Sequence, residues 1–295
     1  MSINILYGNL HPHLWEPISD AIRFVRGALM ANGLAVRVGT NQLDMKSLNL
    51  FFDRFFVEPD LPLVLKVGGA RYGFVCTESV MPDGTWNFGA EGDKQDNLTA
   101  FDLAVRNAEF VWCLLEHSVE YCRKLNPRTA FLPFGYVESM ETLVDTPWAA
   151  RDIDALLCGL PSERRDRVMD QIADLGFRIC HPGRSVPMPV RDALMERARL
   201  SLSVQKTDRH DIVSVARISH SLVNRVPILL ETADIDNRFA KYCLVSEPGK
   251  VVETAAHHLR ETDLEAWAQA RYDEFKTEMP MASIMRDVLD ATTDL

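Results

Sequence analysis

The sequence predicts an α/β protein built from two doubly wound lobes that face each other across a cleft. Short apolar runs alternate with stretches of helical periodicity, which is the pattern of parallel sheets covered by helices. The alternation lapses over Val137–Arg151 and then restarts, so we read that stretch as the connection between domains. The length of 295 residues also favours two domains, because single hydrophobic cores stop growing near about 250–300 residues.

The first half opens with a β-α-β pattern. Ile3–Tyr7 is a short apolar run, Leu14–Met30 has apolar residues at helical spacing and ends at Asn32-Gly33, and Leu34–Val38 is β-like. The pattern continues with helices predicted over Asp44–Phe56, Leu98–Asn107 and His117–Leu125, and with strands over Tyr72–Cys76, Glu109–Leu115 and Thr129–Pro133.

The second half repeats the pattern and ends in helices. Strands are predicted over Ile153–Cys158, Phe177–Cys180, Arg199–Val204, Pro227–Leu230 and Tyr242–Ser246. Helices are predicted over Ser162–Leu175, Val190–Arg197, Ile212–Asn224, Lys250–Leu259, Leu264–Thr277 and Ala282–Ala291. We therefore expect Rossmann-like domains over residues 1–137 and 138–281, followed by a C-terminal helical segment, 282–295.

Composition and charge narrow the class of partner. Apolar residues make up 47% and charged residues 25%, as in ordinary globular proteins, and the formal net charge is −10. That charge disfavours nucleic acid as the main partner but leaves local phosphate binding open. Neither a signal-peptide pattern nor an apolar stretch of about 20 residues is present, so we expect a cytoplasmic protein without a membrane span.

The six cysteines form no CxxC pair, and no Cys/His spacing matches a zinc site. Most lie within apolar runs. We interpret them as reduced, buried thiols and expect no metal site.

Four segments of the second half together resemble bacterial glycosyltransferases of the GT-B fold, in particular the group of spore-maturation-like glycosyltransferases. The segments are AFLPFGY (130–136), DIDALLCGLPSERRDRV (152–168), RDALMERARLSLSVQ (191–205) and DIVSVARISHSLVNRVPILLE (211–231). The resemblance spans roughly Phe110–Phe275, and the order of the segments carries it.

The resemblance implies a metal-independent transferase that uses a nucleotide-diphosphate sugar, with a UDP-sugar favoured, and no further cofactor. It implies a donor site in the C-terminal lobe, an acceptor site in the N-terminal lobe and a C-terminal helix, here Ala282–Ala291, that packs back on the first lobe.

A candidate phosphate-binding turn follows the strand predicted over Ile153–Cys158. Gly159 allows close approach of the backbone, Ser162 begins a helix whose free N–H groups attract anions, and Arg164 and Arg165 follow. The alternative is a tight turn in which Ser162 caps the helix and the arginines face solvent.

Three further donor-site candidates lie around the helix predicted over Ile212–Asn224. Asp211, at its start, matches the place where the family often carries a carboxylate for the donor's ribose or sugar; the alternative is an N-cap. Arg217 has apolar neighbours and must either be paired or reach a ligand phosphate. Lys206 follows a strand and is a candidate diphosphate contact.

The remaining candidates lie on loops. His181 follows the second strand of the second lobe, where it can stack on the nucleotide base or simply face solvent. His11 and His13 follow the first strand and suit a general base, with loop histidines as the alternative. Glu116 follows an apolar run and can orient the sugar, or only stabilise a helix start.

These observations favour a glycosyltransferase that acts on an acceptor hydroxyl of a glycan, small molecule or protein. Two alternatives remain open: a GT-B-like nucleotide or sugar binding module without catalysis, and a nucleotide-sugar epimerase.

Overall fold

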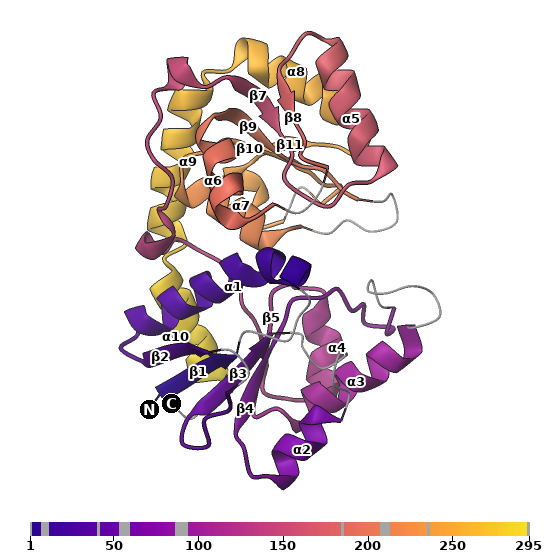
Figure 1. Ribbon diagram of the computed structural model, residues 1–295, viewed down its shortest axis with the longest axis vertical. Helices are drawn as coiled ribbons and strands as arrows, with labels where there is room; N and C mark the ends of the chain where they lie inside the picture. The colour runs from indigo at the N-terminus through magenta and orange to yellow at the C-terminus, as the bar shows by residue number, and fades with distance from the viewer. Residues whose placement is uncertain are drawn as a thin grey trace. The chain divides into compact units, whose positions relative to one another are not determined.

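The computed structural model describes residues 2–6, 12–39, 42–52, 60–85, 94–183, 186–206, 213–234 and 237–293, with side chains in the first helix from residue 18 and in the third from residue 98. The chain divides into two compact units (Figure 1). The first contains Met1–Phe134 together with Met281–Leu295, and the second contains Gly135–Pro280.

The first unit is built on a six-stranded sheet in the order β2-β1-β3-β4-β5-β6, in which every pairing is parallel. Its strands are β1 (Ser2–Leu6), β2 (Ala35–Gly39), β3 (Leu48–Phe52), β4 (Tyr72–Cys76), β5 (Val111–Cys113) and β6 (Thr129–Phe131). All residues of β3, β4 and β5 are buried, as expected of central strands covered on both faces.

The helices described in this unit are α1 (Pro12–Ala31), α2 (Leu61–Val67), α3 (Lys94–Asn107), α4 (Ser118–Leu125) and α10 (Met281–Thr292). The chain returns to the first unit through α10, which lies beside α1 and β6 (Figure 1). Two hydrogen bonds fix this helix: Trp112 Nε1 donates to Thr292 Oγ1 at 2.9 Å, and Asn32 Nδ2 donates to the Ala282 carbonyl at 2.9 Å.

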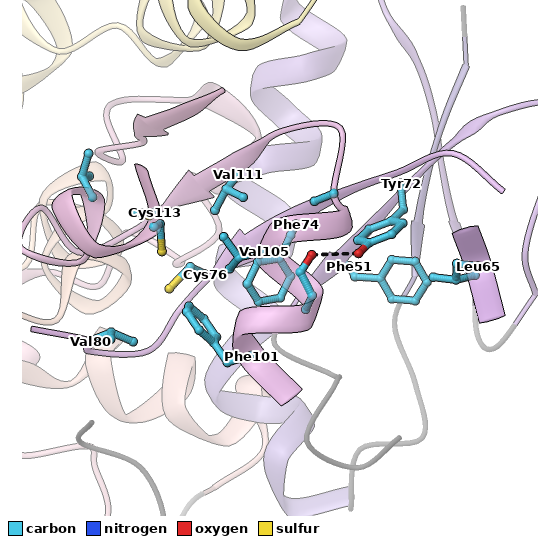
Figure 2. Packing of buried hydrophobic residues seen from close by; sticks show 14 of the residues in the cluster. Phe51, Leu65, Tyr72, Phe74, Cys76, Val80, Phe101, Val105, Val111 and Cys113 are labelled. Atoms are coloured by element: carbon cyan, nitrogen blue, oxygen red, sulfur yellow. Dashed lines mark hydrogen bonds between the residues drawn. The ribbon is translucent and has the colours of Figure 1, made fainter. Parts of the chain in front are cut away.

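Aromatic and aliphatic side chains fill the space between the sheet and α3 (Figure 2). Phe74 meets Phe101 edge to face with the ring centroids 5.6 Å apart, and the buried Tyr72 hydroxyl donates to the Ala104 carbonyl at 2.7 Å. The buried phenol is thus satisfied, so it does not weaken the apolar core.

The geometry of the first unit requires glycine at position 33 and at position 73, for different reasons. Gly33 has φ +76° and ends α1, and its N–H bonds the Met30 carbonyl at 3.0 Å, which confirms the predicted helix end. At Gly73 a Cβ atom would lie 2.3 Å from Phe110 Cζ. That ring stacks on Trp112 with centroids 4.6 Å apart, so it has little room to move.

The second unit has a five-stranded parallel sheet in the order β11-β10-β9-β7-β8. Its strands are β7 (Ile153–Leu156), β8 (Ile179–Cys180), β9 (Ala198–Ser203), β10 (Ile228–Glu231) and β11 (Leu244–Ser246). Its helices are α5 (Glu163–Asp174), α6 (Met188–Glu196), α7 (Val215–Val223), α8 (Val251–Glu261) and α9 (Leu264–Glu278).

One element was predicted wrongly. The stretch expected to form a helix over Asp44–Phe56 contains the central strand β3, which pairs with β1 and β4. Its sequence LNLFF is buried at every position, so it shows no alternation, and a short apolar run of this kind fits a buried strand or a buried helix equally well.

The stretch read as a connection, Val137–Arg151, lies within the second unit and contains the short 3₁₀ turns Glu138–Met140 and Trp148–Ala150. Throughout the described ranges, every helix is too short or too polar to cross a bilayer.

Candidate functional site

The carboxyl edge of the second sheet gathers the donor-site candidates. Gly159 follows β7, His181 follows β8, and Lys206 lies three residues beyond β9. In open α/β sheets this edge is where ligands bind, because loops and helix starts converge there.

Gly159 lies directly against two guanidinium groups. A Cβ atom on this residue would stand 3.1 Å from Arg165 Nη1 and 3.1 Å from Arg217 Nη2. The structure therefore brings together three residues that lie up to 58 positions apart in the chain. The small size of Gly159, rather than an unusual φ, allows this approach.

Arg165, on the first turn of α5, is buried and bonds only backbone carbonyls within the described part of the chain. Its Nε and Nη2 donate to the Val204 carbonyl at 2.9 and 2.7 Å, and Nη1 donates to the Leu160 carbonyl at 2.8 Å. Burial, followed by repulsion from Arg217 and Arg164, lowers the pKa of Arg165 to about 10. This side chain ties the turn after β7 to the end of β9 and adds positive charge there.

Arg217, on the first turn of α7, is half-buried. Among the described residues it has no hydrogen-bond or ion-pair partner. Burial lowers its pKa, Cys158 raises it, and the positive charge of Arg191 lowers it again. A partly desolvated guanidinium without a counter-charge is unfavourable, and an anion bound beside Gly159 would relieve it.

Arg164, in contrast, forms an ion pair with the buried carboxylate of Glu231. Its Nη1 donates to Glu231 Oε2 at 2.8 Å, its Nη2 makes a second bond to Oε1, and Nη1 also donates to the Gln205 carbonyl. Glu231 is fully buried at the end of β10 and also accepts from the Gln205 N–H at 2.8 Å. This pair holds the ends of β9 and β10 in place.

The sequence reasoning missed Glu231. The available signal was a carboxylate that ends the apolar run PILLE, because a charge at the end of a buried strand needs a cation.

A second missed group lies on α6 and α7. His220 is 1% exposed, and its Nε2 lies 3.2 Å from Asp192 Oδ1 and 3.1 Å from Arg191 Nη2. Arg191 Nε and Nη2 also donate to Asp192 Oδ1, at 3.0 and 2.6 Å. On the other side of the ring, His220 Nδ1 lies 3.2 Å from Asn224 Nδ2. The Oδ1 atom of Asn224 accepts a hydrogen bond from the Thr142 N–H. The network fixes α7, and with it Arg217.

The remaining candidates for the donor site differ in burial and in their hydrogen-bond partners. Ser162 is the N-cap of α5 and accepts from the Arg165 N–H at 3.3 Å, but Arg164 and Arg165 do not face solvent as the capping alternative expected. The His181 side chain is 6% exposed and pairs through Nδ1 with Asp166 Oδ1 at 3.1 Å. It is thus not the solvated loop histidine of the alternative reading. Lys206 is exposed, and Asp211 lies outside the described residues.

The first-lobe candidates are only partly described. His11 lies outside the described residues, and His13 falls within α1 where side chains are not described. Glu116 lies between β5 and α4 and is exposed. It lines a cavity of about 620 Å³ together with Val119, Glu120, Arg123, Lys124 and Phe131.

Comparison with known proteins adds evidence on the fold. No protein-family model matches the sequence, and no curated protein matches it. Among solved structures, a putative UDP-N-acetylglucosamine 2-epimerase from Listeria monocytogenes is similar at a TM-score of 0.54 and 9% identity, with 98% of this chain and 94% of that chain covered.

Two further solved structures are similar to this chain over most of its length. The N-terminal domain of trehalose-6-phosphate phosphatase from Candida albicans is similar at a TM-score of 0.53 and 10% identity, over 98% of this chain and 96% of that one. An α,α-trehalose-phosphate synthase (UDP-forming) from Burkholderia vietnamiensis is similar at 0.50 and 12% identity, over 92% and 79%. The chain therefore has a GT-B glycosyltransferase-like fold made of two Rossmann-like α/β units, as its sequence predicted.

Proposed function

We propose that the second unit binds the diphosphate of a nucleotide sugar at the turn after β7, and that the protein transfers the sugar to an acceptor hydroxyl. The observation that carries the proposal is the half-buried Arg217 guanidinium, which lies against Gly159 without a partner in the described part of the chain.

The chemistry of a diphosphate matches this arrangement. Its oxygens accept from a guanidinium fork, and Gly159 leaves room for them beside the backbone. Arg165 supplies positive charge but keeps its N–H groups on the Val204 and Leu160 carbonyls. In a transfer reaction, negative charge grows on the departing diphosphate, and fixed cations at that point lower the barrier without a metal ion.

The remaining donor contacts belong to the same proposal. Ser162 and the start of α5 lie next to the turn, Lys206 is exposed at the same edge, Asp211 would bind the ribose or sugar, and His181 would border the base. UDP is the favoured nucleotide. UDP is part of the names of two of the similar proteins, the Listeria epimerase and the Burkholderia synthase.

On the acceptor side, transfer with inversion requires a base that removes the hydroxyl proton. His11 and His13 are the proposed bases. An unperturbed imidazole has a pKa of about 6.5, so it can accept a proton at neutral pH. Glu116 lines a cavity in the first unit and is the proposed carboxylate that orients the sugar.

Ligand-induced thermal stabilisation tests the donor site. We expect UDP and UDP-sugars to raise the melting temperature of the purified chain, since a ligand at 100 times its dissociation constant adds about 2.7 kcal/mol. Arg217→Ala should abolish the shift. Arg197→Ala is the matched control, because this exposed arginine bonds Asp152 at the opposite, amino edge of the same sheet. Equal shifts in both variants would refute the proposed anion site.

Epimerisation is the second candidate function, favoured by the similarity to the Listeria protein. An epimerase converts a nucleotide sugar without any acceptor. Incubation of the chain with UDP-sugars alone, followed by chromatography of the products, separates the two reactions. A new nucleotide sugar indicates epimerisation, acceptor-dependent release of UDP indicates transfer, and binding without either product indicates a non-catalytic module.

A further inference from the structure

Three cysteines that lie far apart in sequence meet in the first unit. Cys76 is the last residue of β4 and Cys113 the last residue of β5, and the two are direct partners in the parallel register. Their sulfurs point toward each other (Figure 2). Cys122 joins them from α4, and the three Sγ atoms all lie within 4.8 Å of one another.

The trio is surrounded by buried apolar side chains. All three cysteines are fully buried in the core that contains Phe101 and Val80. The Cys76 thiol lies 3.3 Å from the Glu78 carbonyl, and the other thiols bond within the trio. Among the described residues, no histidine or carboxylate joins the group.

Hydrogen bonds within the trio and burial together raise the pKa of Cys76 and of Cys113. For Cys76, the hydrogen bond with Cys113 lowers the pKa, but the bond with Cys122 and burial outweigh it and raise the pKa overall. For Cys113, the bonds with Cys122 and Cys76, and then burial, raise the pKa. Cysteine binds a metal ion as the thiolate, so metal binding at the trio would release thiol protons.

The ligand set selects the ion. Three sulfurs placed about 2.3 Å from a central ion are about 4 Å apart, which the observed separations allow. Zinc structural sites are almost always four-coordinate, and the apolar walls leave no described side chain to supply a fourth ligand. Soft thiolate ligands favour Cu(I), which accepts three sulfurs. We propose that Cys76, Cys113 and Cys122 form a three-sulfur site for one Cu(I) ion.

The trio lies in the first unit, whereas the proposed donor site lies in the second. Thr77 and Glu78, which follow Cys76 at the carboxyl edge of the first sheet, are half-buried rather than buried. The expectation that the chain holds no metal rested on spacing along the sequence, and that spacing does not reveal a cluster assembled from two strands and a helix.

Competition for Cu(I) under anaerobic, reducing conditions tests the proposal. The full chain, free of nucleotide, is titrated against a coloured Cu(I)–bathocuproine disulfonate complex, and loss of colour reports uptake. We expect one equivalent per chain and a higher melting temperature of the loaded chain. Cys122→Ala should weaken uptake by about tenfold or more and remove the thermal shift.

Cys243→Ala is the matched control. Cys243 is also buried, and burial also raises its pKa, but it lies outside the trio, so uptake should be unchanged. If Cys122→Ala does not melt cooperatively, the nearly isosteric Cys122→Ser serves in its place. Failure of the folded wild-type chain to take up Cu(I), or full uptake by the folded Cys122 variant, would overturn the proposal. Neither outcome bears on nucleotide binding.

Discussion

Gly159 and Arg217 lie in direct contact at the carboxyl edge of the second sheet, with 3.1 Å between a Cβ position on the glycine and Arg217 Nη2. The contact couples the turn after β7 to the first turn of α7. It leaves the Arg217 guanidinium beside the half-buried backbone of Gly159, with no hydrogen-bond or ion-pair partner among the described residues.

Gly159→Ala should weaken nucleotide binding while the fold persists. The added methyl group displaces the ends of Arg165 and Arg217, which are flexible enough to move but lose their positions. We expect about tenfold lower affinity for UDP, equivalent to about 1.4 kcal/mol, by isothermal titration calorimetry.

Gly39→Ala is the control for that substitution, since among the described residues a Cβ there would meet only Asn4 Oδ1, at an ordinary contact distance of 3.6 Å. Unchanged UDP affinity in Gly159→Ala would show that the contact does not contribute to the binding site.

Glu231→Gln should destabilise the second unit. The change removes the charge that the Arg164 fork binds and leaves a partly buried cation without its partner. Loss of one member of a buried pair costs about 3–5 kcal/mol, to be measured as a lower transition temperature by calorimetry.

Asp152→Asn is the comparison, because it breaks an exposed pair with Arg197 that contributes about 0–1 kcal/mol. Similar losses in the two variants would contradict the structural role assigned to Glu231.

Thr292→Val should weaken the attachment of α10 to the first unit. The substitution leaves the buried Trp112 Nε1–H without an acceptor, which costs about 1–3 kcal/mol of unfolding free energy. Thr293→Val is matched, since Thr293 directly follows α10 and its hydroxyl donates to the Leu289 carbonyl. Hydrogen exchange of the Trp112 indole N–H should accelerate in the first variant and not in the second.

Asp154 should contribute stability that depends on pH. Burial raises the pKa of this carboxyl, but hydrogen bonds and charge from Arg178 and Arg199 outweigh burial and lower it below the ordinary value. A lowered folded-state pKa means that the contribution is complete above the unfolded pKa of about 3.9 and is lost as the pH falls through the folded value.

The melting temperature of Asp154→Asn should therefore lie below that of the wild type at neutral pH. The gap should narrow as the pH falls below about 4. A gap that stays constant down to about pH 2 would show that the difference arises from packing and not from ionisation.

Much of the architecture was predictable from local pattern. Alternation of apolar runs with helical periodicity predicted two parallel α/β units, and the Asn32-Gly33 helix end was confirmed because Gly33 adopts a positive φ. The helix predicted over Asp44–Phe56 was wrong, because β3 is buried on both faces and carries no alternation that would distinguish it from a helix.

The candidate site was predictable only in part. Gly159 and Arg217 were identified singly, from a strand-to-helix turn and from a cation among apolar neighbours. Their contact depends on packing between α7 and the turn, which no local pattern encodes. The ion pair between Arg164 and Glu231 was missed for the same reason, since the two residues are 67 positions apart.

By itself, the sequence determined the order and type of most elements, since hydrophobic period and turn residues act over a few positions. Only the tertiary structure decided that Arg217 lacks a partner among the described residues, that the Glu231 carboxylate is buried, and that Cys76, Cys113 and Cys122 share one core. These facts depend on distances between segments far apart in the chain, and such distances are fixed when the sheets and helices pack together.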